Sequence, residues 1–96
     1  MQLSFTGEVV YWRGPAPFYF VEVPEPVSEL IAADKAELTY GWGCIPARAR
    51  IAGTDFTTAL FPKDDLYMLP VKAAVRTKLD IDVGDEVSVV MEVGPA

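Results

Sequence analysis

The side chains best suited to bind a ligand are basic and aromatic residues that occur in separate segments. Lys72 and Arg76 have the spacing of neighbours on a helix, Arg48 and Arg50 alternate along an expected strand, and Arg13 follows a tryptophan. Guanidinium groups pair with carboxylates or phosphates through two hydrogen bonds, and aromatic walls that exclude water strengthen the pairing. If these segments pack together, we expect a site for a small anionic or aromatic-anionic ligand, formed by Lys72, Arg76, Arg48, Arg50 and Arg13 with Trp12, Trp42 and Tyr67.

Structural roles are open to the same residues. The stems of Lys72 and Arg76 could lie over the edge of the fold while their charged ends reach water or the acidic segment 80–85. Trp42 stands between two glycines and could anchor a loop to the core instead of lining a pocket. Those glycines lack the spacing and the following helix of a phosphate-binding loop. Both interpretations stay open at the level of sequence.

Catalysis and metal binding have little support in the composition. The chain has no histidine and a single cysteine, Cys44, so the commonest general base and the commonest metal ligand are absent. Asp80, Asp82 and Asp85 lack the loop length and the terminal glutamate of an EF-hand. We therefore assign no catalytic residue, no metal site and no cofactor. Cys44 is expected to be a small buried residue.

The charge balance bears on the partners of the chain. Eight lysines and arginines against fourteen acidic residues give a formal net charge of −6, which repels a phosphate backbone. Nucleic acid is therefore disfavoured as a partner. The apolar runs are shorter than a bilayer span, and no basic start precedes a hydrophobic segment. We expect no membrane partner and a cytoplasmic location, with which a single cysteine agrees.

The pattern of the chain predicts short strands with two short helices. With 96 residues, the chain is expected to form one domain, residues 1–96. Strands are expected at 2–12, 18–23, 37–40, 45–52, 56–61, 67–69 and 86–93, and helices at about 26–35 and 70–79, where prolines stand at the starts. This order is typical of a small closed or partly closed, mostly-β barrel.

Three local features carry specific expectations. Residues 45–52 alternate, so Ala47, Ala49 and Ile51 should face the core while Arg48 and Arg50 face outward. The glycine at position 7 predicts a bend or a bulge in the first strand. A turn is expected at 53–55. Together these features predict two β-hairpins, 2–23 and 45–61.

The motifs also resemble a known family. GWGCIPARARIAGTDFTTALFP and YMLPVKAAVRTKLDIDVGDEVSVVMEV, together with FYFVEVP and PEPVSELI, are similar to the bacterial family named domain of unknown function 1905. That family has no established activity. The last segment is also similar to the swapped-hairpin pattern of AbrB/MazE-type proteins, through Arg76, Leu79, Gly84 and Asp85. This likeness implies a double-split barrel and a possible homodimer.

Two functions follow from the residues and the resemblances. The first is a non-catalytic binding module for a small anionic or aromatic-anionic ligand. The alternative is a dimeric regulator of the AbrB/MazE type or a protein-interaction adaptor.

Overall fold

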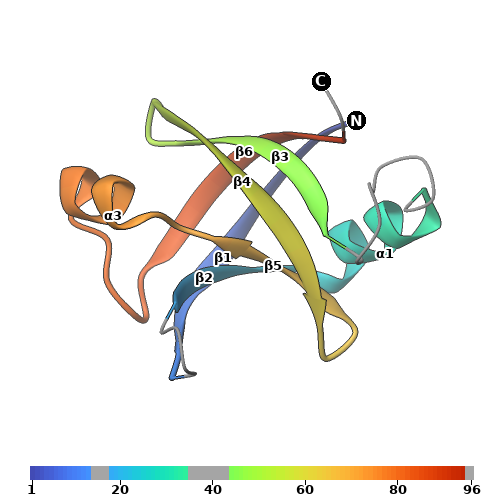
Figure 1. The fold of residues 1–96 in the computed structure, drawn as a ribbon, viewed down its shortest axis with the longest axis horizontal. Coiled ribbons are helices and arrows are strands. Elements are labelled where there is room, and N and C mark those ends of the chain that lie inside the picture. Colours follow the sequence, from blue (N-terminus) through green and yellow to red (C-terminus); the bar gives the residue numbers. More distant parts are fainter. Residues whose placement is uncertain (14–17, 35–43, 95–96) are drawn as a thin grey trace.

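The computed structural model contains six antiparallel strands that close into a barrel in the order β1-β2-β5-β4-β3-β6 (Figure 1). It describes residues 1–13, 18–34 and 44–94. The elements are β1 (Gln2–Trp12), β2 (Phe18–Val23), α1 (Glu25–Ala33), β3 (Ile45–Ile51), β4 (Thr54–Lys63), β5 (Leu66–Pro70), α3 (Ala73–Leu79) and β6 (Glu86–Val93). The predicted mostly-β barrel with two short helices is confirmed.

The barrel closes because β1 is shared between two groups of strands. Its first part, Gln2 to Glu8, pairs with β6, and its second part, Val9 to Trp12, pairs with β2. The register with β6 is unbroken through Gly7, so the sequence-based suggestion of a bulge is wrong. A Cβ at Gly7 would lie 2.5 Å from the carbonyl oxygen of Glu22. Glycine is needed here because it admits the backbone of β2.

The six strands pair within one chain. Each described strand has a neighbour on both sides, so the barrel needs no strand from a second copy. The swapped-hairpin likeness therefore stays a prediction. Among the residues that the structure describes, no helix has the length and apolar character to cross a membrane.

Two hairpins turn through pairs of residues with positive φ. Between β3 and β4 these are Ala52 and Gly53, with φ of 48° and 79°. The turn predicted at 53–55 is misplaced, because Thr54 already pairs with Ile51 in the ladder. Between β4 and β5 the corresponding pair is Asp64–Asp65, with φ of 52° and 66°. Positive φ at both turn residues matches the twist of the flanking strands and fixes their register.

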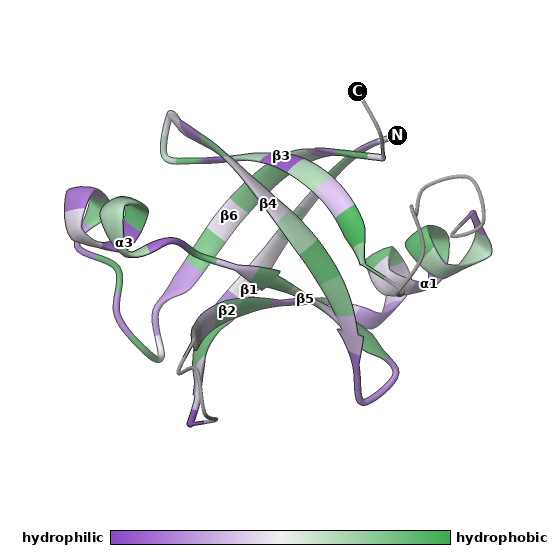
Figure 2. Ribbon diagram, in the orientation of Figure 1, coloured by the Kyte–Doolittle hydropathy of each residue, from purple (hydrophilic) through white to green (hydrophobic). Residues whose placement is uncertain are grey.

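The interior of the barrel is apolar and continuous. On β3, Ala47, Ala49 and Ile51 are buried while Arg48 and Arg50 are exposed, as the alternation predicts. The change of hydropathy along this strand is visible in Figure 2. The side chains with less than 2% exposure that meet in the core cluster are Val9, Val21, Val23, Ile31, Ile45, Leu60, Leu69, Val89 and Met91.

Helix α1 is joined to the barrel by a buried serine. The Ser28 hydroxyl donates to the carbonyl of Val23 at 2.9 Å and accepts from the amide of Tyr67 at 3.1 Å. Val23 and Tyr67 face each other in the β2–β5 register. Ser28 thus connects α1 to two strands, and it is the polar side chain buried in the described part of the chain. The pattern of the sequence did not single it out.

Helix α3 begins later than its proline predicts. Pro70 is the last residue of β5 and pairs with Phe20, and the amide of Val71 continues the contact by donating to Tyr19. Lys72 caps the helix with extended φ and ψ of −63° and 148°, and the helix starts at Ala73. The start at Pro70 was wrong because pairing with β2 keeps this segment extended. The two helices lie at opposite sides of the barrel (Figure 1).

Candidate functional site

The predicted basic residues lie in different places on the barrel. Arg48 and Arg50 lie on the outer face of β3, and Lys72 lies beside the neighbouring strand β4. Arg76 lies over β2, and Arg13 is exposed just beyond the end of β1. The fold therefore brings three of the five predicted cations to one surface. The reason is strand pairing, since Lys72 is more than twenty positions from Arg48 and Arg50 in the chain.

A short row of polar side chains crosses β3, β4 and the segment after β5. Arg48 and Thr57 are partners in the β3–β4 register, and Lys72 Nζ lies 3.4 Å from Thr57 Oγ1. We call Arg48, Thr57 and Lys72 the basic row. Lys72 is the N-cap of α3, and its carbonyl accepts from the amide of Arg76 at 3.0 Å, so the two residues are one helical turn apart as the sequence predicted. Their side chains nevertheless separate, because that of Lys72 reaches Thr57 and that of Arg76 lies on Tyr19. Thr57 therefore neighbours both cations, Arg48 through the strand register and Lys72 through its hydroxyl.

Neither cation of the basic row is neutralised by a carboxylate in the part of the chain that the structure describes. Its three ion pairs involve Met1, Arg50 and Lys63. Glu92 is the partner of Arg48 across β6, but its carboxylate contacts the amino group of Met1 at 3.2 Å. Arg48 and Lys72 are both exposed. They are therefore free to pair with an anion from outside.

Arg50 differs from Arg48 because it has a partner. Its Nε and Nη2 donate to the two carboxylate oxygens of Asp55 at 2.6 Å and 3.0 Å. The hydrogen bond and the charge of Asp55 raise the pKa of Arg50, and the hydrogen bond from Arg50 lowers the pKa of Asp55. The pair joins directly opposed residues of the hairpin. Arg50 is thus already occupied, although it lies beside the basic row.

A groove of about 580 Å³ lies on the outer face of the sheet beside Arg48 and Thr57, and Lys72 stands outside its lining. Two carboxylates, those of Asp55 and Glu92, are also part of the lining. Its walls include Arg48, Arg50 and Thr57, and its apolar surface includes Val90, which is 41% exposed. Val90 is the partner of Arg50 across β6. The groove therefore offers a charged part and an apolar part within one cavity.

Arg76 is held by an aromatic ring of β2. The centre of its guanidinium lies 3.7 Å from the centroid of the Tyr19 ring, and its Nε donates to the carbonyl of Val71 at 3.4 Å. The ring of Tyr11 lies 5.0 Å from that of Tyr19. These contacts stabilise the position of α3 on the barrel through a cation–π interaction and packing.

The predicted aromatic residues also separate. Tyr67 is buried in the core cluster, and burial raises the pKa of its hydroxyl, so it does not line the groove. Trp12 is 44% exposed at the end of β1, away from the lining of the groove. Trp42 and the predicted strand 37–40 lie outside the described residues. Cys44 is exposed, so its prediction as a buried residue was wrong.

Sequence reasoning missed Thr57, the residue that links the two cations. Its position could have been found from the hairpin, because the β3–β4 register pairs Thr57 with Arg48 once the turn is placed at residues 52 and 53. The described residues contain no group of three or more His, Cys, Asp or Glu side chains that could hold a metal ion.

Comparison with known proteins identifies a family but no activity. The family model described as "Domain of unknown function (DUF1905)" matches residues 5–91. No curated protein matches the chain. The match includes all three residues of the basic row and all of the groove lining except Gln2 and Glu92.

Proposed function

This chain belongs to the DUF1905 family, whose description gives no activity, and we propose that it is a non-catalytic binding module for a small anionic ligand. The ligand binds at the basic row, Arg48, Thr57 and Lys72. The observation that supports this most strongly is that two exposed cations neighbour Thr57 and have no carboxylate partner in the described part of the chain.

The three side chains provide complementary donors for an anion. Arg48 presents a planar fork that can bind a carboxylate or phosphate through two hydrogen bonds. Lys72 donates to Thr57 Oγ1, and the hydroxyl keeps its own proton to donate to a ligand. An anion between the cations also offsets the repulsion between them. The row therefore favours a ligand with at least two acceptor oxygens.

The groove beside the row suggests the rest of the ligand. Its volume of about 580 Å³ lies within the range of small-molecule sites, roughly 300–1,000 Å³. The exposed side chain of Val90 offers an apolar surface next to the charged one. A carboxylate that carries an aromatic or aliphatic group matches this division better than a bare inorganic anion. We therefore propose an aromatic or aliphatic carboxylate as the ligand class.

A titration followed by ¹H–¹⁵N NMR tests the proposal, with benzoate and inorganic phosphate as probes. We expect benzoate to shift amide signals of β3 and β4, and the Arg48→Gln/Lys72→Gln variant to bind it at least about tenfold more weakly, as expected for two charge-assisted hydrogen bonds.

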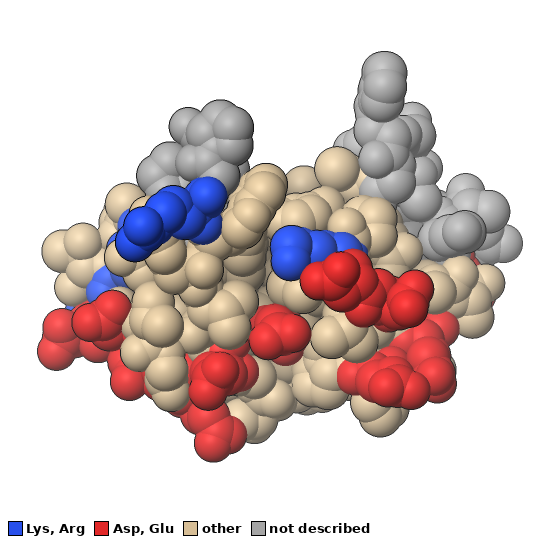
Figure 3. Space-filling model, turned by 90° about the horizontal axis from the view of Figure 1, so that it is seen from below, with Lys and Arg blue, Asp and Glu red and all other residues tan. Residues whose placement is uncertain are grey.

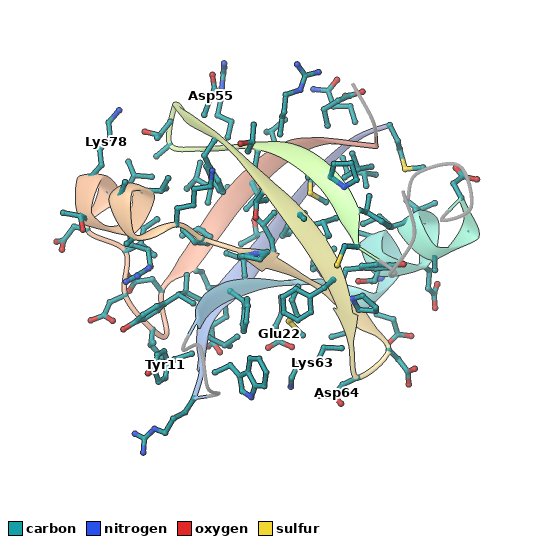
Figure 4. The ribbon with its side chains drawn as sticks, in the orientation of Figure 1. Tyr11, Glu22, Asp55, Lys63, Asp64 and Lys78 are labelled. Carbon is teal, nitrogen blue, oxygen red and sulfur yellow. The ribbon has the colours of Figure 1, made fainter. Side chains whose placement is uncertain are left out.

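The matched control is Lys78→Gln. It also removes a positive charge, but Lys78 points away from the barrel on α3 (Figure 4), so its benzoate affinity should stay unchanged. If the double variant binds benzoate and phosphate as well as the original chain does, the basic row is not an anion site.

A further inference from the structure

Strands β2 and β5 lie across the barrel from β3 and β6. They carry an apolar cluster on their outer face. Phe20 is 1% exposed, although it alternates with Val21, which is part of the core. Met68 is 4% exposed, and its neighbour Leu69 is part of the core. Neither Phe20 nor Met68 belongs to the core cluster, so both are buried outside the barrel. This arrangement requires other side chains to cover them.

Two aromatic rings provide that cover. The Phe61 ring packs edge-on against Phe20 with centroids 5.0 Å apart, and the Trp12 ring lies 6.3 Å from Phe20. Phe61 is also the partner of Met68 in the β4–β5 register. We call Trp12, Phe20, Phe61 and Met68 the aromatic shelf. Trp12 itself remains 44% exposed, so the shelf has an open aromatic edge.

A groove of about 230 Å³ lies at this edge. Its lining includes the shelf residues Trp12, Phe20 and Met68 and three charged side chains, Glu22, Lys63 and Asp64. Lys63 Nζ is paired with the carboxylate of Asp64 at 3.1 Å. Glu22 is half-buried and has no ion pair or side-chain hydrogen bond within the described residues. The unpaired Glu22 carboxylate thus lines the same groove as the exposed Trp12. Figure 4 shows Glu22 on the same side of the barrel as Lys63 and Asp64.

The side of the molecule that holds the groove carries charges of both signs. Figure 3 shows acidic side chains over the lower half of this face and separate groups of basic side chains above them. The lower ends of β1 and β2 and the turn between β4 and β5 point to this side in Figure 1. Lys63 and Asp64 pair with each other, so the Glu22 carboxylate is the charge in the lining of this groove that is left to pair with a cation.

We propose that this groove binds a small organic cation, an ammonium group attached to a flat apolar part. The aromatic face attracts the cation and the Glu22 carboxylate pairs with it, while the apolar part packs against the shelf. The groove is smaller than the usual range of drug-sized sites, roughly 300–1,000 Å³, which limits the ligand to about one ring. The site uses different residues from the basic row and does not depend on it.

Benzyltrimethylammonium chloride is a suitable probe, titrated into the full chain and followed by ¹H–¹⁵N NMR. We expect shifts at β1, β2 and the turn after β4, and a Kd about three- to tenfold weaker for Glu22→Gln, because one partly buried ion pair is lost. Trp12→Leu keeps an apolar cover over Phe20 but removes the π face, so it should weaken binding similarly.

Three controls separate this site from non-specific attraction. Glu29→Gln removes a carboxylate from the exposed surface of α1 and should leave the Kd unchanged. Benzyl alcohol is neutral and phenylacetate is negatively charged, so both should shift the signals of β2 and of the turn after β4 much less than the ammonium probe does. Shifts caused by phenylacetate at β3 and in the middle of β4 would report the basic row and not this groove.

The proposal is overturned by any of three results. Equal binding of benzyl alcohol would indicate only an apolar patch, and equal weakening by Glu29→Gln would indicate only a diffuse negative field. Binding of a lysine-rich peptide without binding of benzyltrimethylammonium would indicate a macromolecular partner in place of a small ligand.

Discussion

The β3 side and the β2–β5 side of the barrel differ in the exposure of the side chains that point outward. On β3 the outward Arg48 is exposed and the inward Ala49 is buried, so the strand has one apolar face. On β2 both the outward Phe20 and the inward Val21 are buried. A side chain that points outward from the barrel is therefore not always exposed to water. In the β2–β5 half, an outer layer of side chains adds to the stability that the core provides.

Because of this difference, substitutions in the basic row and in the aromatic shelf should affect folding to different degrees. The basic row makes few contacts with other side chains, so its residues can be exchanged with little effect on folding. The aromatic shelf combines buried rings with one exposed edge, so substitutions there change folding and the proposed cation site together. Glu22→Gln removes the charge but preserves the side-chain volume, so it tests cation binding with little effect on folding.

The largest expected effect comes from Phe20→Ala. Removal of a buried phenylalanine costs about 3–5 kcal/mol in the free energy of unfolding, and we expect the lower part of that range because the shelf lies outside the core. Urea unfolding of Phe20→Ala and Arg48→Ala would measure the comparison directly. If both variants unfold at the same urea concentration, the outer layer of β2 contributes no more than an exposed face.

The next effect in size is that of Ser28→Ala, in the same half of the barrel. Ser28 satisfies the carbonyl of Val23 and the amide of Tyr67, and an unsatisfied buried group costs about 1–3 kcal/mol. Ser4→Ala, at an exposed position on the outer face of β1, serves as the control and should be nearly neutral. Amide exchange at Tyr67 should accelerate in Ser28→Ala, and unchanged protection would contradict the role of the hydroxyl.

The smallest expected effect is that of breaking the exposed ion pair between Arg50 and Asp55 on the β3–β4 hairpin. The pKa of Asp55 is lowered by Arg50, so the pair adds stability above the ordinary carboxyl pKa, about 3.9, and loses it as the pH falls through the lowered value. The urea midpoints of the original chain and Asp55→Asn should differ slightly at neutral pH and converge as the pH falls below the lowered pKa of Asp55. A difference that is constant over this range would exclude the charge as its cause.

The strand β3, which has one buried face and one exposed face, was predictable from the sequence. The alternation at 45–52 correctly assigned Ala47, Ala49 and Ile51 to the core and Arg48 and Arg50 to the outer face. The strand periods and the turn residues also indicated a mostly-β barrel. These features follow from contacts between residues close together in the chain, which a local pattern records.

The position of the candidate site was harder to predict from the sequence. Lys72 was expected on a helix, but pairing of Tyr19 with Val71 and of Phe20 with Pro70 keeps its segment extended. The same extension places Lys72 beside Thr57. A proline is compatible with the start of a helix and with the end of a strand, so the sequence pattern did not distinguish them.

The sequence by itself determined the class of the fold, the charge of the chain and the inward and outward residues of β3, because period-2 alternation and turn chemistry act locally. Only the tertiary structure decided that Lys72 meets Thr57, that Arg76 lies on Tyr19 and that Phe20 is covered from outside. Each of these contacts joins strands or helices that are distant in the chain. Their register is chosen by packing of the whole barrel, which no short segment encodes.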